Sequence, residues 1–229
     1  MNKVLALFYG VWSLLVLGYI LNATFGVLVA EVTWVLRPLP LVLLAGWVFY
    51  RWPKDQGRKL ALILGLLLFA AGDALVFQEG YYSASLLLYM CGFLAYTIWV
   101  ARGVSMDHFR WMALIPVICL ALLGGYWLWW TPSLLREGMV LYVVLVTACV
   151  ICVILFPRLH WVALPGVVLL ALSQALMGYH NYLGDVPHAT VVIMLLYYAG
   201  HFGLAHGPLW YQVPDESPLG YVTPGEVGR

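Results

Sequence analysis

Asp73 is the residue whose type and position most directly indicate chemistry. It lies in an apolar run, Leu60–Phe77, that contains no other charged residue. Placing a carboxylate at membrane depth costs about 2.5–3.5 kcal/mol on insertion scales. Ionisable residues in such segments usually pair with one another or mark proton, ion or substrate sites. We therefore take Asp73 as the centre of a candidate site, with a side chain able to give or take a proton.

Other polar side chains fall at a similar depth in several different apolar runs. They are Arg37, Tyr89, Tyr142, Ser173, Gln174, Tyr197 and Tyr198. His180 belongs to the loop that joins the last two runs, and His201 lies deeper in the last run. Polar residues from several helices at one level predict a buried polar cavity around Asp73.

Each of these residues also has a purely structural interpretation. Asp73 can form a structural ion pair with Arg37, and Ser173 can bond to the backbone of its own helix. Gln174 can join neighbouring helices through its amide. The tyrosines can be core aromatics whose hydroxyls are satisfied. The functional interpretation rests on their convergence around one carboxylate.

The composition is that of a membrane protein, with 64% hydrophobic and only 9% charged residues. The apolar residues form eight runs of about 16–20 residues, the length that crosses a hydrocarbon core as a helix. The runs are Val4–Leu21, Trp34–Tyr50, Leu60–Phe77, Ser85–Val100, Met112–Trp127, Val140–Phe156, Leu164–Tyr179 and Ala189–Leu204. The sequence predicts an all-α integral membrane protein, with eight transmembrane helices in one bundle.

Basic residues set the expected orientation, because Lys and Arg are enriched in cytoplasmic loops. Of the 11 basic residues, all but Arg37 and Arg136 fall at one set of helix ends, which we assign to the cytoplasm together with both termini. Asp73 and Arg37 then lie in the outer half of the membrane. A net charge of +1 gives no reason to expect nucleic acid as a partner.

We expect residues 1–206 to form the transmembrane domain and residues 207–229 a flexible cytoplasmic tail, rich in Pro, Gly and acidic residues. The four cysteines all lie in apolar runs and are expected to pack as small residues. A single CxxC spacing does not make a zinc site. We expect no metal and no cofactor.

The chain also contains a short internal similarity. Gly72–Leu75 is matched about one hundred residues later by Ser173–Leu176, and a Tyr and a Gly follow each segment. This favours two parallel four-helix repeats, related by an axis along the membrane normal, with Asp73 and Gln174 facing each other.

With these motifs in this order, the sequence resembles the YhhN-like lysoplasmalogenases, a family of eight-helix membrane enzymes found in bacteria and animals. The resemblance rests on Arg37-Pro38-Leu39, Gly72-Asp73-Ala74-Leu75, Tyr142, Ser173-Gln174 and Tyr197-Tyr198. It covers nearly the whole chain up to about His206. We expect the protein to lie in the bacterial cytoplasmic (inner) membrane.

The resemblance implies hydrolysis of the vinyl ether bond of lysoplasmalogens, so the partners would be a lysophospholipid substrate and membrane lipids. Carbon protonation is slow at neutral pH, so an acid is needed, and burial in an apolar layer favours the protonated form of a carboxyl group. A close guanidinium has the opposite effect and suits a base. The implied catalytic residues are Asp73, Gln174, Tyr198 and His201. The implied substrate-binding residues are Arg37, Tyr89, Tyr142, Ser173, Tyr197 and His180.

The chain departs from the family pattern at three positions. Arg37 stands where the family usually has Lys, Gln174 where it usually has a second Asp, and His201 near a usual Gln. The loss of one carboxylate leaves three alternatives open. His201 or His180 takes over acid–base work, the cleaved bond is a different lipid ether or ester, or the protein binds or transports lipid without catalysis. A metal-dependent hydrolase and a proton-coupled transporter are further alternatives, and the oligomeric state is not predicted.

Overall fold

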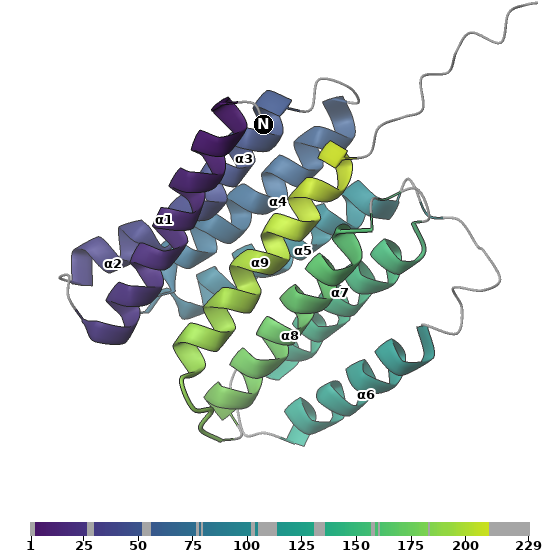
Figure 1. Cartoon of the computed structure of the whole chain (residues 1–229). Helices are drawn as coiled ribbons and strands as arrows, with labels where there is room; N and C mark the ends of the chain where they lie inside the picture. Colours follow the sequence, from purple (N-terminus) through teal and green to yellow (C-terminus); the bar gives the residue numbers. More distant parts are fainter. Residues whose placement is uncertain are drawn as a thin grey trace, which may run out of the picture.

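The computed structural model describes residues 3–26, 30–51, 56–76, 78, 80–101, 104, 114–130, 136–156, 159, 161–182 and 184–210. All regular secondary structure in this part of the chain is helical (Figure 1). The helices are α1 (Lys3–Phe25), α2 (Ala30–Leu36), α3 (Leu39–Arg51), α4 (Gln56–Leu75), α5 (Tyr82–Ala101), α6 (Leu114–Trp130), α7 (Arg136–Ile154), α8 (Ala163–Tyr182) and α9 (Ala189–Trp210). The prediction of an all-α fold is confirmed.

The sequence predicts one continuous helix for the second apolar run, whereas the structure has two helices there. The helical segment begins earlier, at Ala30, and is broken between α2 and α3 by a turn at Arg37 and Pro38. Proline has no N–H to donate and disfavours helical geometry at the residue before it. The chain restarts when the amides of Leu41 and Val42 bond to the carbonyl of Pro38. Arg37 is thereby held at a break in the helix and not in a regular turn of it.

Within the described residues, six helical segments are long and apolar enough to cross a membrane. The α2–α3 segment counts as one of them, from Val32 to Arg51. Helix α4 is not among the six, and α6 is a shorter apolar helix of 17 residues. All eight predicted runs therefore correspond to helical segments, and six of these meet the length and composition of a membrane span.

One predicted boundary, the end of the transmembrane domain at 206, differs in the structure. Helix α9 continues through Pro208 to Trp210, past the predicted domain end at 206, because its last turn packs on the start of α8, with Gly207 close to Ala163. The rest of the predicted tail, 211–229, lies outside the described residues. So do five basic residues used for orientation, namely Lys54, Arg102, Arg110, Arg158 and Arg229.

The helices pack as two close pairs, α4 with α5 and α8 with α9 (Figure 1). Two helices join the pairs: α7 packs on both α5 and α8, and α3 packs on both α4 and α9. Helix α1 packs on α9 and α3. Helix α6 lies at the edge beside α7, and it has no buried residue. The core cluster is formed by all the long helices except α6, with Tyr96, Trp99 and Tyr198 among its largest fully buried side chains.

The two close pairs use the same packing device. A Cβ at Gly92 would lie 2.7 Å from the ring of Phe69, and a Cβ at Gly200 would lie 2.7 Å from the amide nitrogen of Leu170. A glycine leaves room for the ring of Phe69 in the first pair and lets the two helix backbones approach closely in the second. Phe69 and Leu170, on the first helix of each pair, are separated by the same number of residues as Gly65 and Gly166. Both of these glycines also lie in close contact with the neighbouring helix. The α4–α5 and α8–α9 pairs are therefore built alike.

Candidate active site

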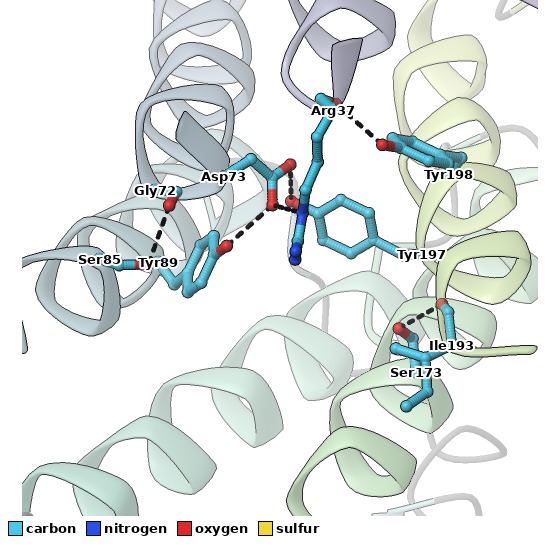
Figure 2. A network of polar contacts seen from close by, with 9 residues as sticks. All are labelled: Arg37, Gly72, Asp73, Ser85, Tyr89, Ser173, Ile193, Tyr197 and Tyr198. Carbon is cyan, nitrogen blue, oxygen red and sulfur yellow. Dashed lines mark hydrogen bonds and ion pairs between the residues drawn. The ribbon is translucent and has the colours of Figure 1, made fainter. Parts of the chain in front are cut away.

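Asp73 lies in the last turn of α4, and its side chain is completely buried. The guanidinium of Arg37 donates through Nε to Oδ1 of Asp73 over 2.9 Å (Figure 2). Arg37 is itself buried, at 7% exposure. A buried charge of one sign is strongly destabilising unless it is paired. The prediction that these two residues are neighbours is confirmed by this contact.

Two tyrosines complete the shell around the carboxylate. The hydroxyl of Tyr89, on α5, donates to Oδ1 of Asp73 over 2.8 Å, and that of Tyr197, on α9, donates to Oδ2 over 3.0 Å. Both rings are buried. Three donors, one of them cationic, stabilise the ionised form of the acid. A carboxylate has about four acceptor positions, so Oδ2 retains capacity for one more donor.

The helix break positions Arg37 through its backbone as well. The hydroxyl of Tyr198 donates to the carbonyl oxygen of Arg37 over 2.8 Å (Figure 2). The break frees this carbonyl from the regular helical pattern, and a buried carbonyl without a donor is costly. The ring of Tyr19 on α1 packs edge-on against Tyr198, with centroids 6.1 Å apart. Tyr198 therefore contacts Arg37, whereas its neighbour Tyr197 contacts Asp73.

A second polar group is centred on Gln174 of α8. The hydroxyl of Tyr142, on α7, donates to Oε1 of Gln174 over 2.7 Å. The hydroxyl of Ser173 donates over 2.9 Å to the carbonyl of Ile193 on α9, and not to its own helix as one structural interpretation had it. Ser85 makes a similar bond from α5 to the carbonyl of Gly72, also over 2.9 Å. These bonds fix the two helix pairs at the level of Asp73.

A small cavity separates the two polar groups. Its volume is about 10 Å³, and its lining residues are Arg37, Tyr89, Ser173, Gln174, Met177, Ile193, Met194 and Tyr197. A space of roughly 10–15 Å³ holds one water molecule when it offers two to four polar partners. The lining thus includes Gln174, which was predicted to be catalytic, together with four residues that were predicted to bind substrate: Arg37, Tyr89, Ser173 and Tyr197.

The two predicted histidines do not join this group. His201 is buried, with Nδ1 2.8 Å from the hydroxyl of Tyr96. Its ring packs edge-on against Tyr197, with centroids 4.5 Å apart. His201 therefore contacts a tyrosine that donates to Asp73 and not the carboxylate itself. His180 accepts from the amide of Val186 over 3.3 Å at the end of α8, where its side chain is 37% exposed. His201 is surrounded by aromatic rings, and His180 belongs to the last turn of α8 and not to the loop after it, as had been expected.

Sequence reasoning did not single out the non-polar part of the site. Met177 and Met194 line the cavity, and Tyr19 and Tyr96 support Tyr198 and His201. Nothing in an apolar run distinguishes such residues from ordinary core residues. Among the residues that the structure describes, no three His, Cys, Asp or Glu side chains gather as a metal site.

A bundle of long apolar helices around a buried Arg–Asp pair is the architecture typical of helical integral membrane proteins with a polar centre. A sequence model of the YhhN family matches residues 32–208, and the chain belongs to that family. The match begins at the segment that carries Arg37 and ends in α9, so it includes the whole polar centre. No curated protein and no solved structure showed a significant similarity to the chain.

Proposed function

We propose that the protein is a membrane-embedded hydrolase that cleaves the vinyl ether bond of lysoplasmalogens to a fatty aldehyde and a glycerophospho-base. Membership of the YhhN family supports a lysoplasmalogenase-type function. The observation that carries the proposal is the buried carboxylate of Asp73, whose tyrosine donors Tyr89 and Tyr197 also line a water-sized cavity.

The reaction needs one proton for carbon and one water. At rest Asp73 is the carboxylate paired with Arg37. The fraction of the protein in which Asp73 is protonated gives that proton to the β-carbon of the vinyl ether, so that an oxocarbenium ion and the paired carboxylate form together. Water then adds to the cationic carbon and returns a proton to the carboxylate. The resulting hemiacetal collapses to the aldehyde and the free glycerol hydroxyl. One carboxylate that gives a proton to carbon and regains another from water replaces the two that the family pattern has.

The partners of Asp73 suit this cycle. Arg37 and the tyrosine hydroxyls stabilise the carboxylate that remains after carbon is protonated. That stabilisation favours the slow proton transfer, and general acid catalysis of this type contributes about 10²–10⁴-fold. Asp73 is not among the residues that line the cavity, whereas Tyr89 and Tyr197 are. The proton therefore passes through a phenol hydroxyl, which gives one proton and takes another.

The lipid has to enter between the helices, because the cavity has room for water and not for an alkenyl chain. Met177 and Met194 line it with unbranched side chains, which rotate more readily than branched ones. Arg37 is engaged with Asp73 in the interior, so its proposed role is in the chemistry and in binding the ether end of the lipid. The charged headgroup stays at the membrane surface.

We further propose that all eight long segments cross the bacterial inner membrane, with both termini in the cytoplasm. Helix α4 carries Asp73 and α6 is short, but each lies between neighbours that satisfy the criteria for a span. The Arg37–Asp73 pair neutralises the two charges that would otherwise oppose insertion of α3 and α4.

The test is aldehyde release by the purified protein in detergent from an alkenyl lysophospholipid. The acyl lysophospholipid with the same headgroup serves as the substrate control. Asp73→Asn should reduce the rate by about 100-fold or more. Thr147→Val is the matched protein control, because the hydroxyl of Thr147 bonds to the carbonyl of Val143 in its own helix. Release that is absent in the wild type, or unchanged in Asp73→Asn, contradicts the proposal.

A second candidate is a lipid-binding or transport protein that uses the same polar centre without catalysis. The observation in its favour is the neutral Gln174–Tyr142 pair, which has no acid–base group of its own. In that case the purified protein binds the alkenyl lipid, Asp73→Asn weakens the binding, and neither protein releases aldehyde.

A further inference from the structure

The likeness between the two helix pairs extends from glycine packing into the polar centre. Asp73 and Gln174 are separated by the same number of residues as Phe69 and Leu170 on the first helices of the two pairs. On the second helices, Tyr89 and Tyr197 are separated by the same number of residues as Gly92 and Gly200. The same separations also relate the position of Gly72 to Ser173 and that of Ser85 to Ile193. In the first helix pair Ser85 donates to the carbonyl of Gly72, and in the second Ser173 donates to the carbonyl of Ile193. The polar centre therefore consists of two corresponding half-sites.

The half-sites correspond in position but not in chemistry. The corresponding tyrosines Tyr89 and Tyr197 both donate to Asp73, one to each carboxylate oxygen. Gln174 occupies the counterpart position and is held by a single hydroxyl, that of Tyr142. One half-site is charged and carries the proton, and the other is neutral. The cavity of about 10 Å³ is lined by Gln174 and Tyr197 from the neutral half-site and by Tyr89 from the charged one.

The Tyr142 bond decides what Gln174 offers to the cavity. An amide side chain has one acceptor oxygen and one donor group. The bond from Tyr142 takes one of the two acceptor positions of Oε1 and fixes the orientation of the amide, and the two Nε2–H groups can donate to a molecule in the cavity. Tyr142 is buried and is not one of the residues that line the cavity. Its effect on a bound molecule therefore has to pass through Gln174.

The cavity is lined by a hydrogen-bond donor for the water oxygen and by an acceptor for a water hydrogen. Gln174, which lines the cavity, can donate an N–H to the water oxygen, and the hydroxyl oxygen of Tyr197 can accept a hydrogen bond from the water. The hydroxyl of Tyr197 already donates to Oδ2 of Asp73. A proton leaving the water can thus bond to the Tyr197 oxygen while the phenol proton moves to the carboxylate. The oxygen that remains forms the new bond to carbon.

We propose that this cavity binds the water that attacks the oxocarbenium carbon, and that Tyr142 is a positioning residue that acts on this water through Gln174. The inference rests on the proposed hydrolase function and deepens it. It assigns the neutral half-site to the nucleophile, and it accounts for the small size of the cavity, which fits water but not a larger nucleophile.

The experiment uses methanol as a competing nucleophile at a fixed concentration in the aldehyde assay. Water adds to give the hemiacetal and then the aldehyde. Methanol adds to give a mixed acetal that retains the glycerophospho-base and is measured by its mass. The share of mixed acetal reports which nucleophile is held at the cation. Unlike the total rate, this share does not change when a variant is merely less active or less stable.

We expect the wild type and Thr147→Val to form far less mixed acetal than the nucleophile concentrations predict. Gln174→Leu and Tyr142→Phe should each raise the share about threefold or more, in keeping with loss of one oriented bond worth about 0.7 kcal/mol or more. Gln174→Asn, which keeps an amide but shortens it, should do the same. Tyr142→Phe should add nothing in the Gln174→Leu background.

Three results would overturn the proposal. The first is an unchanged share in Tyr142→Phe, and the second is an additive effect of Tyr142→Phe on top of Gln174→Leu. Either would remove the water site while leaving aldehyde release, and so the proposed function, intact. The third is the absence of aldehyde from the wild type, which removes the proposed function and this proposal with it.

Discussion

The hydroxyl of Tyr197 lies 3.0 Å from Oδ2 of Asp73 and joins two residues that are 124 positions apart. This bond runs between α9 and α4, so the last helix completes the shell of a carboxylate carried by the first half of the chain. Arg37 and Tyr89, the other two donors, belong to that first half. The candidate site thus depends on contact between the halves, and not on either half alone.

Asp73→Asn is expected to reduce stability as well as activity. It leaves the guanidinium of Arg37 buried without its counter-charge, and breaking a buried pair in this way costs about 3–5 kcal/mol. The double variant Arg37→Gln/Asp73→Asn should be more stable than Asp73→Asn alone, because no unpaired charge remains. Thermal unfolding in detergent measures both. Equal melting temperatures for the single and double variants would contradict a charge pair in the native state.

Arg37→Lys is expected to retain more aldehyde release than Arg37→Met. Lysine keeps the positive charge beside Asp73 but lacks the planar group that directs Nε to Oδ1. We expect Arg37→Lys to lose about tenfold in kcat, from one poorly placed charge-assisted bond, and Arg37→Met to lose about 100-fold or more. Initial rates at saturating lipid give both values. If Arg37→Met keeps the wild-type kcat, the guanidinium has no part in the reaction.

Tyr197→Phe and Tyr198→Phe are adjacent changes with different expected effects. Tyr197 donates to the carboxylate, so its loss should reduce kcat by about tenfold or more. Tyr198 donates to the carbonyl of Arg37, so its loss leaves a buried acceptor unsatisfied and costs about 1–3 kcal/mol of stability. Its kcat should fall less. Parallel kinetics and unfolding curves decide the assignment, which the reverse ranking would refute.

Gly200→Ala is expected to be more destabilising than Gly92→Ala. At Gly200 the added methyl would meet the backbone of α8, at Leu170 and Gly166, and a backbone cannot move without separating the helices. At Gly92 it would meet the side chain of Phe69. Gly10→Ala is the control, because nothing lies within 4 Å of a Cβ there, and it should stabilise α1 by about 0.5–1 kcal/mol. Melting temperatures that fall from Gly10→Ala through Gly92→Ala to Gly200→Ala would support the close contact between the backbones of α8 and α9.

Much of the fold could be predicted from the sequence, because the apolar runs have the length of helices and are separated by polar loops. The break at Arg37 and Pro38 was missed, although proline in an otherwise helical run gives that signal. The pairing of Arg37 with Asp73 was foreseen because a buried charge needs a partner. For these features, local sequence and elementary electrostatics are sufficient.

The division of labour within the site could not be predicted. Tyr197 and Tyr198 are adjacent, and successive residues on a helix point about 100° apart, so only the packing of α9 decides which one meets the carboxylate. His201 was predicted to act with Asp73, but it lies against Tyr96 and Tyr197. The partner of Gln174 depends on how α7 packs on α8. These are tertiary relations that the spacing of residues does not determine.

The bond between the Tyr198 hydroxyl and the Arg37 carbonyl has a consequence for biosynthesis. The chain is made from its N-terminus, so Arg37, Asp73 and Tyr89 are synthesised and can meet while α9 is still in the ribosome. At that stage the backbone at Arg37 and Oδ2 of Asp73 each lack a donor that α9 will later bring. We therefore expect truncated chains that end before α9 to be recognised as incomplete by membrane proteases. The hydrogen-bonded shell of Asp73 and Arg37 is complete only after α9 has been made and has packed against the earlier helices.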